Sequence, residues 1–255
     1  MVLAAVPGVN ALVQAASRGI GFEILRQLLS RDRDGRFVAT CRDPRKATAL
    51  QALAAENDGR VLIVPLELAD EGSIRAAADR TAEYLDELQL LINVGGFLHR
   101  PGQEPERRLD DVNADSLHAS FAVNAVGPLL VVKHFRRFLP RRGRAVVASL
   151  SARVGSIGDN RLGGWYAYRA SKAAQNMFTR CLSVELARRH RGVICVALHP
   201  GTVDTDLSRP FQARVPSEKL FSTERAARQL LDVIVSLRPE DNGAFFAWDG
   251  QPVPW

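Results

Sequence analysis

Short apolar runs alternate with longer segments of helical periodicity along the chain. The runs have the length and composition of strands: NALVQ, RFVAT, VLIVPL, LLIN, AVVAS, VICVAL and AFFAW. The segments between them carry apolar residues three and four positions apart, as helices packed on a core do, and they cover residues 19–31, 45–56, 70–88, 114–138, 166–190 and 223–235. This alternation predicts a parallel sheet whose strands are joined by crossover helices.

The predicted architecture is an α/β, doubly wound Rossmann fold with a single seven-stranded parallel sheet and helices on both faces. A chain of 255 residues has the length of one such domain, so residues 1–255 are expected to form a single unit. Ligands of these sheets bind beyond the carboxyl ends of the strands, where the strand order reverses. The residues that directly follow each strand are therefore the candidates for chemistry.

Composition excludes several classes of protein. The cysteines Cys41, Cys181 and Cys195 are odd in number and far apart in apolar surroundings, which predicts reduced, buried thiols without a disulfide. The histidines have no metal-ligand spacing, so no metal is expected. The net charge of +6 comes from scattered arginines without a nucleic-acid motif. No apolar run approaches the roughly 20 residues of a membrane span, and no signal peptide is evident, so we expect a cytoplasmic protein that binds neither nucleic acid nor membrane.

A glycine-containing turn follows the first strand and leads into a helix. Its residues are Ala15, Ala16, Ser17, Arg18, Gly19, Ile20 and Gly21. Glycines in such a turn let the backbone approach a pyrophosphate at the helix N-terminus. Two glycines by themselves fit equally well with a tight turn that binds nothing.

The second strand ends in Cys41 and Arg42, where an NAD site would have an acidic residue for the adenosine ribose. Arg42 and Arg18 are instead suited to pair with a 2′-phosphate through charge-assisted hydrogen bonds. This favours NADP(H) over NAD(H). The alternative is that both arginines are solvated surface residues, and the adjacent Asp43 adds a negative charge.

Tyr168 and Lys172 begin the fifth predicted helix, and their spacing of four places them on one helix face. A free phenol has a pKa of about 10, and a nearby ammonium group lowers that value by favouring the phenolate. Tyr168 is thereby suited to act as a proton donor or acceptor. An amphipathic tyrosine beside a solvated lysine is the plain alternative.

Several ordered motifs now define a resemblance over nearly the whole length of the chain. They are SRGIG in the first turn, NVGG after the fourth strand, FAVNAVGP, the stretch LSARVGSIGDNRLGGWYAYRASKAAQNM, and HPGTVDTDL. In these motifs the chain resembles the short-chain dehydrogenases/reductases, and most of all their C-factor-like or sniffer-like carbonyl reductases. The resemblance implies an NADP-dependent oxidoreductase that interconverts a carbonyl and an alcohol.

The resemblance also implies roles for individual residues. Tyr168 would be the general acid, Lys172 would lower its pKa and bind the nicotinamide ribose, and Asn124 would hold a water in a proton relay. The cofactor would be bound by Ser17, Arg18, Gly19, Ile20, Gly21, Arg42, Glu67, Leu68, Asn93, Val94, Gly95, Pro200, Gly201, Val203 and Thr205, together with Tyr168 and Lys172. Asn124 and the Pro200 turn also have purely structural interpretations, as a backbone bridge and a turn.

The family also places a hydroxyl after the fifth strand, where it hydrogen-bonds the substrate oxygen. Its usual spacing before Gly155 falls on Ala152, so the candidates are Ser149, Ser151 and Ser156. We expect Ser151 to serve, because a one-residue adjustment of the loop would restore the hydroxyl.

Other departures from the family's pattern are Ala15 in place of a glycine, Val94 and Gly95 in place of asparagine and alanine, and Glu67 in place of aspartate. They motivate an alternative function, a catalytically weak dinucleotide-binding or cell-signalling protein that retains the fold. The partner would be a small carbonyl or alcohol compound bound near a loop at 205–222, with Phe97, Trp165 and Phe211 as apolar candidates for its pocket. Packing in the core is an equally good interpretation of Trp165. The resemblance implies a homodimer formed through the helices at 114–138 and 166–190.

Overall fold

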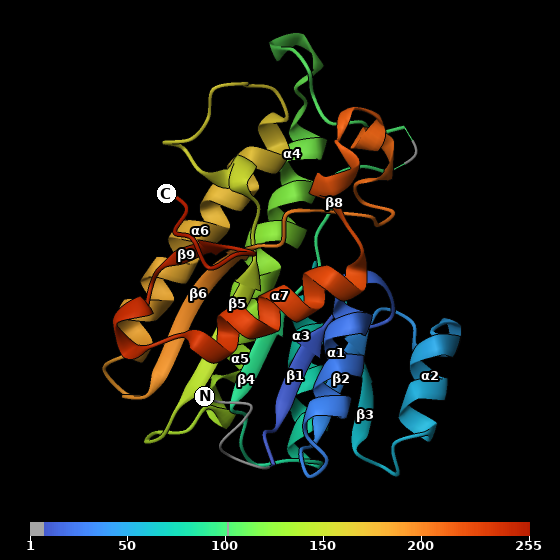
Figure 1. Ribbon diagram of the computed structural model, residues 1–255, viewed down its shortest axis with the longest axis vertical. Helices are drawn as coiled ribbons and strands as arrows, with labels where there is room; N and C mark the ends of the chain where they lie inside the picture. The colour runs from blue at the N-terminus through green and yellow to red at the C-terminus, as the bar shows by residue number, and fades with distance from the viewer. Residues whose placement is uncertain (1–7, 101) are drawn as a thin grey trace.

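The computed structural model describes residues 8–100 and 102–255. In this part of the chain, seven parallel strands form the central sheet in the order β3-β2-β1-β4-β5-β6-β9 (Figure 1). The strands are β1 Ala11–Gln14, β2 Phe37–Cys41, β3 Val61–Pro65, β4 Leu90–Asn93, β5 Ala145–Leu150, β6 Val193–His199 and β9 Phe245–Ala247. The predicted seven-stranded parallel sheet is confirmed.

Helices cover both faces of this sheet, which confirms the doubly wound fold. The first face is covered by α1 Gly19–Arg31, α2 Thr48–Ala55 and α7 Thr223–Ser236. The second is covered by α3 Glu71–Ala82, α5 Gly127–Phe135 and α6 Tyr166–Leu186, and α4 Ala114–Phe121 packs against α6.

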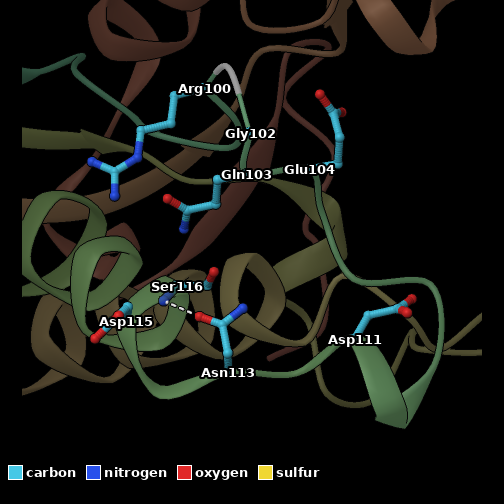
Figure 2. A pocket seen from close by; sticks show the side chains of 8 residues that line it. All are labelled: Arg100, Gly102, Gln103, Glu104, Asp111, Asn113, Asp115 and Ser116. Atoms are coloured by element: carbon cyan, nitrogen blue, oxygen red, sulfur yellow. Dashed lines mark hydrogen bonds between the residues drawn. The ribbon is translucent and has the colours of Figure 1, made fainter.

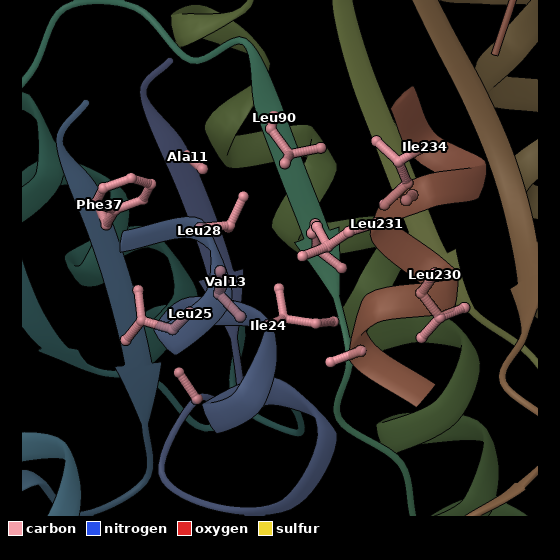
Figure 3. Close-up of a cluster of buried hydrophobic side chains, with 14 of the residues drawn as sticks. Ala11, Val13, Ile24, Leu25, Leu28, Phe37, Leu90, Leu230, Leu231 and Ile234 are labelled. Atoms are coloured by element: carbon pink, nitrogen blue, oxygen red, sulfur yellow. The ribbon is translucent and has the colours of Figure 1, made fainter. Parts of the chain in front are cut away.

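Two apolar cores lie between the sheet and these helix layers, because alternate strand residues point to opposite faces. In β1, Val13 packs against α1 and α7, whereas Leu12 packs on the other side. Figure 3 shows the first core, in which Leu28 of α1 is fully buried. Truncating such a side chain to alanine costs about 2–5 kcal/mol. The same packing fixes the strand ends and the turns that follow them.

The strand order reverses between β1 and β4. From β1 the chain proceeds to β2 and β3 on one side, and then from β4 to β5, β6 and β9 on the other. The register aligns Gln14 with Asn93 and Asn93 with Ser149 at the carboxyl edge of the sheet. The crevice expected at such a reversal is therefore bordered by the turns after β1 and β4.

Three helices differ in length from the prediction. The helix expected at 70–88 ends at Ala82. Leu85 and Leu88 are still buried, but they belong to the irregular segment that returns to the sheet. The helix expected at 166–190 ends at Leu186. The segment at 45–56 is a 3-10 turn, Pro44–Lys46, followed by α2. The predicted helices were too long because apolar residues continue at helical spacing beyond the residue at which the helix ends.

The helix expected at 114–138 is continuous but changes geometry in its middle. A π-helical segment, Ala122–Val126, joins α4 to α5, and a 3-10 turn ends the helix. Among the described residues, this stretch alone has the length and mean hydropathy to cross a membrane. Here α5 packs against α3 and α4 against α6. Length and composition alone are weak grounds for a membrane span.

Short elements that the sequence did not predict follow β6. Strand β7, Thr202–Val203, pairs in parallel with β8, Leu220–Phe221. Between them lie 3-10 segments at Arg209–Arg214 and Ser217–Lys219. The loop expected at 205–222 is thus closed at its base by a two-stranded sheet.

Candidate active site

The turn after β1 exposes the N-terminus of α1 at the carboxyl edge of the sheet. Arg18 is the N-cap residue in extended conformation, and no side chain caps the helix there. The first N–H groups of an uncapped helix suit an anionic ligand such as a pyrophosphate. The predicted residues Ser17 to Gly21 all lie in this turn or in the first helical residues.

The backbone of this turn requires conformations that favour glycine. Gly19 has φ +58°, and a Cβ on Gly21 would overlap the carbonyl of Ala15. Ala15 itself has φ +62°, where an alanine is strained. The amide N–H groups of Ala15 and Ala16 donate to Thr40, which ties the turn to β2.

Arg18 and Arg42 both lie near this turn, with Arg42 exposed directly after β2. Arg18 Nη1 forms an ion pair at 3.0 Å with Asp206 in the loop between β7 and β8, and both side chains are more than half exposed. The carboxylate of Asp43 turns away to accept hydrogen bonds from the amide and Nε of Arg45. The negative charge beside Arg42 is therefore already paired, which leaves Arg42 available for a phosphate.

The turn after β4 is held by a residue that the sequence reasoning missed. The side-chain oxygen of Gln14 accepts hydrogen bonds from the amides of Val94 (3.2 Å) and Gly95 (2.7 Å). A Cβ on Gly95 would collide with Gln14 and with Leu68. The departure from the family's alanine at this position thus makes room for Gln14.

Asn93 and Glu67 have structural partners in the same region. Asn93 Nδ2 donates to the carbonyl of Pro128 and to Ser149 Oγ, across the strand ends. Glu67 Oε1 accepts from the amide of Ala69, and Leu68 is buried next to Gly95. These residues border the crevice at the predicted adenosine side.

The segment from Pro200 to Thr205 follows β6 and reaches the turn after β1. Gly201 has φ +80° and lies so close to the Phe221 ring that a Cβ would collide with it. Val203 is buried in β7, and the Thr205 methyl lies 3.7 Å from where a Cβ on Gly19 would be. The structure therefore brings the predicted nicotinamide segment to the N-terminus of α1.

Tyr168 and Lys172 lie side by side on α6 in a buried environment. The Lys172 ammonium nitrogen is 6.0 Å from the centroid of the Tyr168 ring. It donates to the carbonyl of Leu150 at 2.7 Å and to Gln175 Oε1 at 2.9 Å. Gln175, one turn after Lys172 on α6, is a second residue that the sequence reasoning missed.

The electrostatics of this pair differ from the expectation. Burial raises the pKa of Tyr168 to about 12 and lowers the pKa of Lys172 to about 7. Desolvation penalises the charged form of each group, and it outweighs the attraction that was expected to lower the Tyr168 pKa. At neutral pH Tyr168 therefore keeps its proton, as a general acid must.

Asn124 lies in the π-helical segment and is fully buried. Its side-chain oxygen accepts from the Phe97 amide, and its Nδ2 donates to the Phe97 carbonyl and to Ser171 Oγ. This side chain bridges the loop after β4 to α6. The predicted water would have to be held by other atoms of Asn124, because its amide group is occupied.

All three candidate serines are buried, and each hydroxyl has a partner. Ser151 donates to Asn176 Oδ1 at 2.7 Å. Ser149 accepts from Asn93, and Ser156 donates to the carbonyl of Trp255. The structure thus places none of these hydroxyls in a hydrogen bond with Tyr168.

A hollow opens between the loop after β4 and the start of α4. It has a volume of about 440 Å³ and is shown in Figure 2, and its lining consists of Arg100, Gly102, Gln103, Glu104, Asp111, Asn113, Asp115 and Ser116. A separate, much smaller cavity of about 10 Å³ shares Gln103, Glu104 and Ser116 with this hollow, and its lining includes Tyr168.

Aromatic side chains also lie next to Tyr168. The Trp165 ring lies 4.9 Å from the Phe211 ring and 6.3 Å from the Tyr168 ring, between centroids. His99 adds an edge contact with Phe211 and bonds to the carbonyls of Asp206 and Leu207. His99 thereby ties the loop between β7 and β8 to the loop after β4. Trp165 and Phe211, two of the residues predicted for the pocket, therefore pack against each other beside Tyr168.

Comparison with known proteins now defines the class of this one. The family model for short chain dehydrogenases matches residues 9–215. The chain therefore belongs to the short-chain dehydrogenase family. A dehydrogenase of Rhodococcus sp., 1-hydroxy-2-glutathionyl-2-methyl-3-butene dehydrogenase, is 32% identical over 96% of this chain and 99% of its own. C-signal of Myxococcus xanthus is 40% identical over 58% of this chain and 83% of its own.

Solved structures give the same result. An NADPH-bound carbonyl reductase from chicken fatty liver has a TM-score of 0.87 and 33% identity, covering 98% of this chain and all of its own. The carbonyl reductase Sniffer of D. melanogaster has a TM-score of 0.84 and 26% identity over the same shares. The chain is an oxidoreductase of the C-factor-like and sniffer-like branch, in a family that acts on carbonyl and alcohol groups with a nicotinamide dinucleotide.

Proposed function

We propose that this protein is an NADP-dependent carbonyl reductase in which Tyr168 is the general acid. The observation that carries the proposal is the buried pair of Tyr168 and Lys172 at the carboxyl edge of the sheet, where Lys172 Nζ donates to the carbonyl of Leu150 at the end of β5. The uncapped N-terminus of α1 and the nearby Thr205 segment fit a dinucleotide that crosses the reversal point. NADPH, when bound, supplies the hydride.

In carbonyl reduction, Tyr168 donates its phenolic proton to the substrate oxygen while the carbonyl carbon gains the hydride. A pKa of about 12 keeps Tyr168 protonated before that step. The Lys172 ammonium then stabilises the phenolate that remains, and solvent returns the proton. Ser151 remains the proposed donor to the substrate oxygen, and this role requires its hydroxyl to rotate away from Asn176.

The preference for NADP(H) is supported by the exposed Arg18 and Arg42 and by the pairing of Asp43 with Arg45. A carbonyl reductase with NADPH bound and a short-chain dehydrogenase/reductase with NADP bound, both among the similar structures, support it further. The remaining predicted cofactor contacts, from Glu67 and Leu68 through Asn93 to Gly95 and from Pro200 to Thr205, are proposed on the same ground.

The proposal is tested by two measurements on the purified protein. Titration with NADPH and NADH, followed by cofactor fluorescence, should give tight binding of NADPH and weaker binding of NADH. NADPH consumption with a panel of aldehydes and ketones should then show turnover. Absence of binding by either nucleotide would overturn the proposal.

The rival function, a catalytically weak dinucleotide-binding or signalling protein, is favoured by one observation. The hydroxyls of all three candidate serines are engaged elsewhere. That rival predicts NADPH binding without turnover of any carbonyl compound in the panel.

We also propose a cytoplasmic homodimer formed through α6 and the helix at 114–138. Met177 and Val184 on α6 are 62% and 51% exposed, and Cys181 between them is exposed too. The expectation of three buried cysteines is wrong at Cys181. These residues are spaced by four and three, so they form an apolar stripe. A monomer in size-exclusion chromatography with light scattering would refute the dimer.

A further inference from the structure

A buried carboxylate outside the proposed mechanism lies beside α6. Glu106 belongs to the segment between β4 and α4, and it is only 3% exposed. Its Oε2 accepts a hydrogen bond from the amide of Ala167 at 3.2 Å, across 61 positions in sequence. Its backbone carbonyl accepts from the amide of Trp165. Burying a carboxylate is destabilising unless hydrogen bonds compensate, so the hydrogen bonds of Glu106 are what allow it to be buried here.

The segment that Glu106 holds has an unusual backbone. Gly163, Gly164 and Trp165 have φ values of +63°, +63° and +51°, and they directly precede α6. A tryptophan is strained in this left-handed region, so the surroundings must hold it there. Arg169 binds the opposite side, donating from Nε to the carbonyls of Gly163 and Gly164. The turn is therefore held by two residues: Glu106 accepts hydrogen bonds from its N–H groups, and Arg169 donates to its carbonyls.

This turn sets the place of the reacting side chain. Tyr168 directly follows Ala167, whose amide is bonded to Glu106, and the Trp165 ring contacts the Tyr168 ring. Glu106 and Tyr168 also line the same small cavity. A shift of the turn would move Tyr168 and Trp165 together, and displacement of a reacting group by about 1 Å is enough to lower a rate 100-fold.

We propose that Glu106 is a positioning residue for the reaction at Tyr168. Its carboxylate holds the first turn of α6, and its carbonyl holds the left-handed turn at 163–165. It acts by accepting hydrogen bonds and transfers no proton. The inference rests on the proposed reductase function, since it assigns a role within that reaction.

The test compares three variants at Glu106. Glu106→Gln keeps an oxygen that accepts from Ala167, so its kcat should stay within about 3-fold of the unmodified protein. Glu106→Ala removes the acceptor, and its kcat should fall roughly 10- to 100-fold with the KM for NADPH unchanged. Glu106→Asp keeps the charge but is one methylene shorter, so it should resemble the alanine variant; it replaces that variant if alanine prevents folding. Asp110→Ala, at an exposed carboxylate in the same segment, is the matched control and should leave kcat unchanged.

Hydrogen exchange gives a readout that does not depend on activity. Peptides covering residues 163–170 should exchange faster in Glu106→Ala than in the unmodified protein, and at the normal rate in Glu106→Gln. Equal kcat in Glu106→Ala and the unmodified enzyme would overturn the inference, as would a glutamine variant as slow as the alanine variant. If the unmodified protein reduces no carbonyl compound, the reductase proposal fails, whereas the exchange experiment still reports whether Glu106 holds the turn.

Discussion

Replacing Ala15 with glycine should stabilise the protein, although glycine is usually the destabilising choice. Ala15 has φ +62°, and a non-glycine residue pays roughly 1–2 kcal/mol in that region. Glycine relieves this strain but adds about 0.4–1 kcal/mol of unfolded-state entropy. The net gain in the free energy of unfolding should be about 0.5–1 kcal/mol.

Urea denaturation followed by circular dichroism measures this difference. The matched control is Ala16→Gly at the neighbouring position, where the alanine is fully buried and its φ is not positive. That variant should lose about 1 kcal/mol, because glycine adds backbone freedom and removes a buried methyl group. Equal losses in both variants would refute the attribution of strain to Ala15.

Three further predictions follow from the site. The pKa of Lys172 is about 7 in the folded protein against 10.5 ordinarily, so the unfolded state binds more protons between pH 7 and 10. The free energy of unfolding, measured relative to Lys172→Met, should therefore rise across that window by roughly 1 kcal/mol per pH unit. A difference between the two proteins that stays constant with pH in urea denaturation would refute the low pKa. Asp206→Asn frees Arg18 from its exposed ion pair, which should change the free energy of unfolding by less than about 1 kcal/mol. NADPH should bind several-fold more tightly to this variant, and NADH binding should be unaffected. Equal effects on both nucleotides would refute the contact of Arg18 with the 2′-phosphate. Ser151→Ala should lower kcat about 100-fold if its hydroxyl serves the substrate oxygen, whereas unchanged kcat would assign Ser151 to its contact with Asn176 alone.

The elements that the sequence predicted well are those with local causes. Helix α1 runs from Gly19 to Arg31 as predicted, because its apolar stripe and its glycine-containing start lie within one segment. The helix after β3 was predicted too long, since Leu85 and Leu88 continue its periodicity from a non-helical segment. Strands β7 and β8 have two residues each, too few for any periodicity.

Site residues that belong to a local motif could be predicted from the sequence. Site residues whose role depends on contacts with distant parts of the chain could not. Tyr168 and Lys172 share a helix face because they are four residues apart. The support of Gly95 by Gln14 spans 81 positions and that of Ala167 by Glu106 spans 61, so neither has a sequence signal. The pKa of Tyr168 was expected to fall, but burial raises it, and burial cannot be read from the spacing of two residues.

The central claim is that Tyr168 donates the proton in carbonyl reduction. The most direct measurement compares NADPH consumption by the unmodified protein and by Tyr168→Phe, with NADPH affinity measured on both. Phenylalanine keeps the ring beside Lys172 and Trp165 and removes only the hydroxyl. The account predicts a loss of kcat of at least about 100-fold with NADPH affinity retained. Turnover by Tyr168→Phe at the rate of the unmodified enzyme would contradict it.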